Sequence, residues 1–126
     1  MAQRTPDIKV EVKTDYIEAQ STPAEDKYVF SYTITIINLG EQDATLKSRY
    51  WLITDGNGEN SEVQGAGVVG ETPRIKPNTA FQYTSGTVLA TPFGVMKGNY
   101  TMQCNNGDKF IVQIPEFCLS TPGLLH

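Results

Sequence analysis

Apolar and polar residues alternate with a period of two along most of the chain, which is typical of β-strands that bury one face. The strongest example is residues 27–38, KYVFSYTITIIN, in which every second residue from Tyr28 to Ile36 is apolar or aromatic. The β-branched and aromatic side chains of this stretch disfavour a helix. The pattern predicts further strands over residues 8–13, 16–20, 44–54, 62–70, 81–89, 98–104, 109–114 and 117–119.

Turn-forming residues separate these segments at short, regular intervals. Residues 55–58, DGNG, and 105–108, NNGD, tolerate the positive φ angles of tight hairpin turns. No stretch has the periodicity of a long helix, and no linker divides the chain. Seven to nine strands, spaced about 8–12 residues apart, predict a single all-β domain over residues 1–126. The expected architecture is an immunoglobulin/fibronectin type III-like sandwich of antiparallel strands.

Aromatic and sulfur-containing residues refine this prediction. The segment around Tyr100 has the spacing of a tyrosine corner, in which a tyrosine precedes a core position by two residues. Met102 holds that position, and we expect Trp51 to fill the core from an earlier strand. Cys104 and Cys118 both follow Trp51, which excludes the disulfide that bridges the sheets of antibody domains. We therefore expect two free thiols in a reducing compartment.

A glycine-rich segment, Gly65-Ala66-Gly67-Val68-Val69-Gly70, fits the G-x-G-x-x-G pattern of dinucleotide-binding folds. In those folds the glycines open a helix whose N-terminus faces a pyrophosphate. Here Pro73 and Pro77 follow closely and prevent a helix of useful length. The acidic residue expected about 20 positions later is also missing.

Two interpretations of these glycines remain. In the first, they belong to a bulged edge strand where another backbone approaches closely. In the second, Gly65, Gly67 and Gly70 form an anion-binding nest of backbone N–H groups, with Arg74 and Lys76 supplying positive charge. Arg49 is a further candidate cation if the fold brings it near.

Catalytic and metal-binding groups are sparse. The single histidine is His126, the terminal residue, where a positioned general base is not expected. Residues 55–66 begin like an EF-hand loop but lack its glycine at the sixth position and its glutamate at the twelfth. We interpret them as a hairpin tip, with weak Mg²⁺ or Ca²⁺ binding as the alternative. The expectation is a non-enzyme without a metal site or a cofactor.

Charge and hydropathy exclude two classes of partner. A formal net charge of −4 and a pI near 4.9 argue against nucleic-acid binding, which needs a basic face. No apolar run approaches the roughly 18 residues of a membrane helix, and the first residues lack the apolar core of a signal peptide. We therefore expect a cytoplasmic protein. Residues 1–71 carry a net charge of −6 and residues 72–126 a net charge of +2. Such an uneven distribution of charge is one way to select partners.

Several long motifs, in the same order, resemble the ApaG family almost from end to end. They are residues 16–21 (YIEAQS), 49–58 (RYWLITDGNG), 62–70 (EVQGAGVVG), 83–86 (YTSG), 91–100 (TPFGVMKGNY), and 114–117 (IPEF) with the tail 124–126 (LLH).

The resemblance implies a fibronectin type III-like sandwich in a small bacterial cytosolic protein. The family takes its name from gene neighbourhood with a diadenosine tetraphosphate hydrolase, and it has been linked to cobalt tolerance and magnesium efflux. Related domains occur as C-terminal domains of eukaryotic proteins, including an F-box protein and a polymerase-delta-interacting protein. A protein-binding role is assumed for them there. The family has no established catalytic residues. Gly65, Gly67 and Gly70 match its proposed pyrophosphate motif.

Two functional hypotheses follow. The first is a non-enzymatic module that binds a protein partner through an exposed sheet edge or an aromatic face. The second is a protein that binds a nucleotide polyphosphate, such as a dinucleoside polyphosphate, or a divalent cation such as Mg²⁺ or Co²⁺. Exposed sheet edges are compatible with either a monomer or a homodimer.

Overall fold

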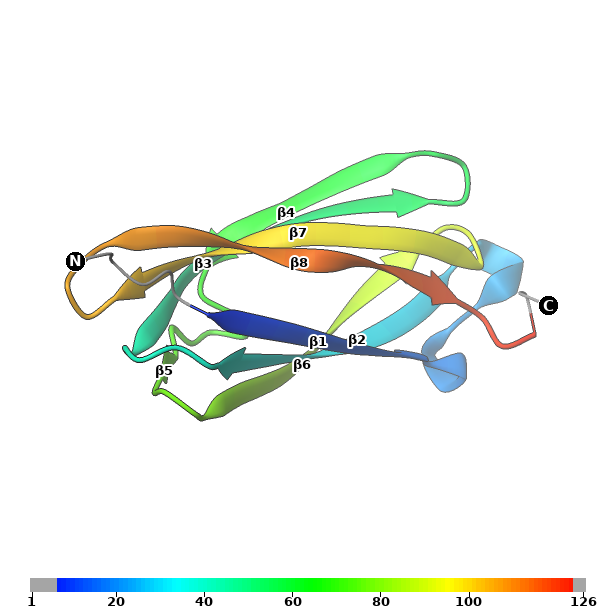
Figure 1. Cartoon of the computed structure of the whole chain (residues 1–126). Coiled ribbons are helices and arrows are strands. Elements are labelled where there is room, and N and C mark those ends of the chain that lie inside the picture. Colours follow the sequence, from blue (N-terminus) through cyan, green and yellow to red (C-terminus); the bar gives the residue numbers. More distant parts are fainter. Residues whose placement is uncertain (1–6, 124–126) are drawn as a thin grey trace.

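The computed structural model describes residues 7–123, which contain eight strands and two short 3-10 helices (Figure 1). In chain order the elements are β1 (Ile8–Tyr16), η1 (Glu18–Gln20), η2 (Pro23–Glu25), β2 (Tyr28–Asn38), β3 (Ala44–Asp55), β4 (Asn60–Ala66), β5 (Arg74–Ile75), β6 (Ala80–Leu89), β7 (Phe93–Cys104) and β8 (Lys109–Ser120).

The strands form two antiparallel sheets that pack face to face (Figure 1). One sheet has the order β1-β2-β6. The other has the order β4-β3-β7-β8, and β5 pairs with the start of β3. The prediction of an all-β sandwich is confirmed, and the eight strands within residues 7–123 fall in the predicted range of seven to nine.

Several strand limits differ from those predicted. Residues 18–20 form a 3-10 helix instead of a strand, and β4 ends at Ala66 instead of Gly70. The last two predicted strands are one continuous strand, β8, which contains Pro115. The β7–β8 register shifts between Met96 and Gly98, where Pro115 lies opposite. A bulge in an edge strand is one of the few places where a sheet accepts proline.

Alternation sorts the side chains of β2 into two faces, as the sequence predicted. Phe30, Tyr32, Ile34 and Ile36 are buried between the sheets. Asn38 continues this inner face and is the one buried polar residue of the described chain. Its Nδ2 donates to the carbonyl oxygens at positions 42 and 75, at 2.7 and 2.9 Å, and its Oδ1 accepts from the N–H at position 40 at 2.9 Å. These bonds tie the β2–β3 loop to β5.

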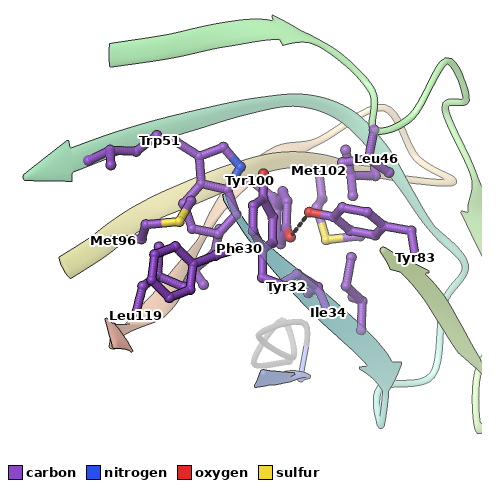
Figure 2. Packing of buried hydrophobic residues seen from close by; sticks show 14 of the residues in the cluster. Phe30, Tyr32, Ile34, Leu46, Trp51, Tyr83, Met96, Tyr100, Met102 and Leu119 are labelled. Carbon is purple, nitrogen blue, oxygen red and sulfur yellow. Dashed lines mark hydrogen bonds between the residues drawn. The ribbon is translucent and has the colours of Figure 1, made fainter. Parts of the chain in front are cut away.

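Aromatic side chains from both sheets meet at Trp51, which is 1% exposed (Figure 2). The ring of Tyr32, from the opposite sheet, lies 5.4 Å away between centroids, and those of Phe117 and Tyr100 lie 5.7 and 6.5 Å away. All three contacts are edge-to-face, a geometry that stabilises aromatic pairs beyond simple burial. Trp51 therefore fills the core as predicted.

Tyr83 on β6 and Tyr100 on β7 join the two sheets through their hydroxyls, 2.5 Å apart (Figure 2). Burial raises the pKa of Tyr83 to about 12, and burial together with Tyr83 places the pKa of Tyr100 well above its usual range. Tyr100 is buried, as a tyrosine corner requires. The tyrosine-corner prediction is nevertheless wrong, because its hydroxyl bonds another side chain and not the backbone.

We predict that Tyr83→Phe and Tyr100→Phe each lower the free energy of unfolding by about 1–3 kcal/mol, because each leaves one buried hydroxyl without its partner. The double variant removes both hydroxyls and is expected to cost less than the sum of the single changes. Guanidinium denaturation of the four proteins at pH 7 measures this cycle.

Alkaline titration gives a second readout of the same pair. A tyrosine with a pKa near 10 when unfolded and a higher one when folded contributes stability that is lost as pH rises above about 10. We expect the unfolding free energy to fall by roughly 1.4 kcal/mol per pH unit for each such tyrosine, and the double variant to lose this slope. Additive single changes, or an unaltered alkaline slope, would contradict the assigned pair.

Candidate functional site

The glycine-rich segment folds as a two-residue hairpin turn. Val68 and Glu71 exchange backbone hydrogen bonds of 2.8 and 2.9 Å across Val69 and Gly70. φ is 43° at Val69 and 81° at Gly70, and two positive values in sequence are the pattern of a type I′ turn. The next element is β5, so the helix that a dinucleotide-binding motif requires is replaced by a strand. The prediction that no helix follows these glycines is confirmed.

Arg49 holds the start of this turn from the neighbouring strand β3. Its Nη1 donates to the carbonyl oxygens of Gly67 at 3.0 Å and of Ala66 at 3.2 Å. The guanidinium lies against Gly65, where an added Cβ would approach Nη1 to 2.9 Å. Glycine at position 65 therefore leaves room for an arginine of the same chain. The guanidinium of Arg49 is thus directed at carbonyl oxygens of the glycine-rich segment.

A close approach of the Glu71 backbone explains why position 67 is a glycine. Its φ is 59°, and a Cβ there would lie 2.0 Å from the carbonyl oxygen of Glu71. Its N–H donates to the carbonyl oxygen of Lys47 at 2.9 Å. The N–H groups of Val68 and Glu71 are bonded as well, so three N–H groups of residues 67–71 bond within the protein. An anion nest instead needs successive N–H groups that point at the ligand.

Among the described residues, no hydrogen bond or ion pair joins either predicted cation to the glycines. Arg74 donates from Nε to Asp43 Oδ2 at 2.6 Å and from Nη2 to Asn105 Oδ1 at 3.0 Å. Along β3, the position paired with Arg74 is four residues from the one paired with Gly65, roughly 13 Å at strand spacing. Lys76 is exposed just after β5. Anion binding by these glycines and cations stays a prediction, and the structure brings only Arg49 to the glycines.

The segment that begins like an EF-hand loop forms a hairpin turn. Asp55 Oδ1 accepts hydrogen bonds from the N–H groups of Asn57 at 2.8 Å and Glu59 at 3.0 Å. Residues 7–123 contain no group of three or more His, Cys, Asp or Glu that could hold a metal ion. Within the same range, no helix is long and apolar enough to cross a membrane. His126 lies outside the described residues.

Both cysteines are free thiols, as the sequence predicted. Burial, with a smaller contribution from the charge of Asp108, raises the pKa of Cys104. A raised pKa lowers the thiolate fraction and with it the nucleophilicity of the sulfur. Cys104 is therefore not an activated nucleophile.

A further candidate is the flank of the sandwich between β4 and β6, which the sequence did not identify. On the opposite flank β1 contacts β8, so β4 and β6 are the outermost strands on this side. A cavity of about 220 Å³ lies here, against the β3–β4 hairpin and the end of β6. Its walls include Ile53, Val88 and Leu89, and two acids, Asp55 and Glu59, line it as well. We refer to this region as the β4–β6 flank.

We predict that Gly67→Ala lowers the free energy of unfolding by about 3 kcal/mol, because the new methyl group meets the Glu71 carbonyl at a positive φ. Gly58→Ala is the matched control, since Gly58 also has a positive φ (80°) but no atom within 4 Å of an added Cβ. We expect a loss of about 1 kcal/mol there. Equal losses in urea denaturation would show that the backbone approach at Gly67 does not matter.

We predict that Val69→Asn stabilises the protein by about 0.5–1 kcal/mol. A β-branched residue at positive φ is strained, and Asn-Gly is the preferred pair for a type I′ turn. Val88→Asn serves as the control because Val88 is similarly exposed, 56% against 51%, and lies in a strand without positive φ. Thermal melts compare the two variants, and a lower melting temperature for Val69→Asn would refute the strain.

Comparison with known proteins places the chain in a family. Residues 18–104 match the ApaG domain. The chain is 75% identical to Protein ApaG of Shewanella piezotolerans over all 126 residues of both proteins, and 68% identical to that of Shewanella oneidensis over 94% of each chain. The chain is 45% identical to the ApaA protein of Bordetella pertussis, whose crystal structure superimposes with a TM-score of 0.91 over 94% of this chain and 96% of that one. Because the domain match covers most of the chain and the identity to the first relative extends over its full length, the chain belongs to the ApaG family.

Proposed function

We propose that this protein is a non-catalytic cytoplasmic module that binds a protein partner through a sheet edge. The observation that carries the proposal is the β4–β6 flank, where outermost strands of both sheets lie beside a cavity lined by apolar and acidic residues. A strand of another protein can satisfy the backbone groups of such an edge by extending the sheet, while its side chains enter adjoining pockets.

The chemistry of the described residues supports binding over catalysis. The groups with clearly perturbed pKa values are two core tyrosines and a thiol made less reactive by burial. Catalytic sites instead gather perturbed acids and bases in an accessible cleft. The acids at the flank, Asp55 and Glu59, lie in a turn, where Asp55 accepts hydrogen bonds from two backbone N–H groups.

A nucleotide polyphosphate or a divalent cation is the alternative ligand, associated with cobalt tolerance and magnesium efflux. It rests on the three glycines and on Arg74 and Lys76. The geometry of the turn favours it less, because Arg49 is directed at carbonyl oxygens and the N–H groups of Gly67, Val68 and Glu71 bond within the protein. One experiment compares both ligand classes.

We predict saturable capture of a specific protein from a native bacterial lysate by the immobilised full-length chain. Excess untagged chain should displace that protein, and the reconstituted pair should give a 1:1 calorimetric isotherm. Capture is repeated with diadenosine tetraphosphate, ATP, Mg²⁺ or Co²⁺, each of which is also titrated alone into the purified chain.

The outcomes separate the two hypotheses. Competed capture without heat from the small ligands supports the protein-binding module. Heat and a raised melting temperature with one small ligand, without competed capture, would support the ligand-binding alternative. Gly67→Ala and Gly58→Ala then show whether that ligand depends on the glycine-rich turn.

A further inference from the structure

The edges of the two sheets differ in how well they are protected against pairing with another chain. Natural edge strands are usually blunted by charged side chains, proline, bulges or short length. β1 alternates charged residues along its exposed face: Lys9, Glu11, Lys13 and Asp15. β8 contains Pro115 in a bulge, and β4 has only seven residues, including Glu62. Three of the four edges of the described sheets therefore carry protection.

β6 carries none of these devices. Its ten residues, AFQYTSGTVL, include neither a charge nor a proline. It pairs with β2 on one side only. Among the backbone hydrogen bonds that residues 7–123 make outside their strand ladders, none involves a residue of β6. The outer edge of β6 is therefore a long row of backbone groups that no loop covers by hydrogen bonding.

The space beside β6 is also open to a further strand. The β1-β2-β6 sheet has three strands, whereas the opposing sheet has four along its main path. β4 runs along the outer margin of that sheet (Figure 1). Val63 of β4 is paired in register with Trp51, and yet it is 38% exposed while Trp51 is 1% exposed. An inward-facing valine with this exposure indicates that no strand of the opposing sheet covers β4.

We propose that the outer edge of β6, from Thr84 to Leu89, receives an extended peptide segment of a partner protein as a fourth strand, with a basic residue of that peptide beside Asp55 and Glu59. This inference rests on the proposed function and specifies its site. The peptide side chains on one face lie toward Val63, and the cavity of about 220 Å³ receives the peptide end nearest Leu89.

Charge selects the peptide sequence, and the antiparallel pairing of this sheet is taken for its direction. The residues that line the cavity include two acids and no lysine or arginine. Arg49 does not offset them, because it lies six residues before Asp55 along β3, roughly 20 Å away at strand spacing. A peptide antiparallel to β6 has its N-terminal residues next to Leu89, which is the acidic end. The fitting segment is therefore basic at its N-terminus and alternates apolar and polar residues after it.

The experiment uses the full-length ¹⁵N-labelled chain and a decapeptide with two N-terminal arginines followed by alternating valine and threonine. We expect slowed amide hydrogen exchange and shifted NMR signals at residues 84–89. Val88→Lys places a charge on this edge and should weaken the peptide affinity at least tenfold. Ile111→Lys is the matched control, because Ile111 is also 56% exposed but lies on β8, and it should change the affinity less than twofold.

A second pair of variants tests the charge. A peptide that begins with two glutamates should bind at least tenfold more weakly, and Glu59→Lys should remove most of this preference. Glu25→Lys, a charge reversal at an exposed residue of η2, should leave it intact. Thermal melts confirm that each variant is folded before its affinity is used.

Three results would overturn the assignment: protection at β4 or β8 in place of β6, equal binding of the glutamate peptide, or dimerisation of the chain through residues 84–89 in sedimentation analysis. A captured partner whose affinity is unchanged by Val88→Lys would also overturn it and leave the proposed protein-binding function standing. Failure to capture any protein competitively would instead reject the proposed function itself.

Discussion

The packing around Trp51 is the constraint from which the arrangement of the two sheets follows. Its indole contacts Tyr32 of the opposing sheet and both Tyr100 and Phe117 of its own sheet. These edge-to-face contacts have strict geometry, so the sheets cannot slide without losing them. The hydroxyl pair of Tyr83 and Tyr100 adds a directional bond across the same layer. Together they set which strands of one sheet lie over which strands of the other.

Because of this placement, the three-stranded β1-β2-β6 sheet does not pack over β4. At one end of β4 the inner face is occupied by Arg49, which lies against Gly65 and binds the first carbonyls of the turn. At the other end the inner face opens toward the cavity beside Leu89. The core packing thus makes the two ends of β4 different. At the closed end Arg49 shapes the glycine-rich turn, and at the open end an added strand has space beside the unpaired edge of β6.

The sequence predicts local structure well because alternation is a local property. Residues 28–38 form one strand with the predicted buried face, and Trp51 fills the core. The order of strands within the sheets depends on distant pairings that alternation does not encode, so the β4–β6 flank could not be anticipated. The tyrosine-corner prediction failed for the same reason, since Tyr83 lies 17 positions before Tyr100 and in the other sheet.

The glycine-rich segment shows why a motif has to be judged by the contacts of each of its residues. Gly65 leaves room for a guanidinium, Gly67 for a carbonyl oxygen, and Gly70 supplies only a positive φ. In a dinucleotide-binding fold the same letters serve the approach of a pyrophosphate and the packing of a helix. The prolines after Gly70 carried the distinguishing information, because they exclude that helix whatever the glycines suggest. A β-hairpin turn that needs each glycine for a separate internal reason requires no ligand to explain it.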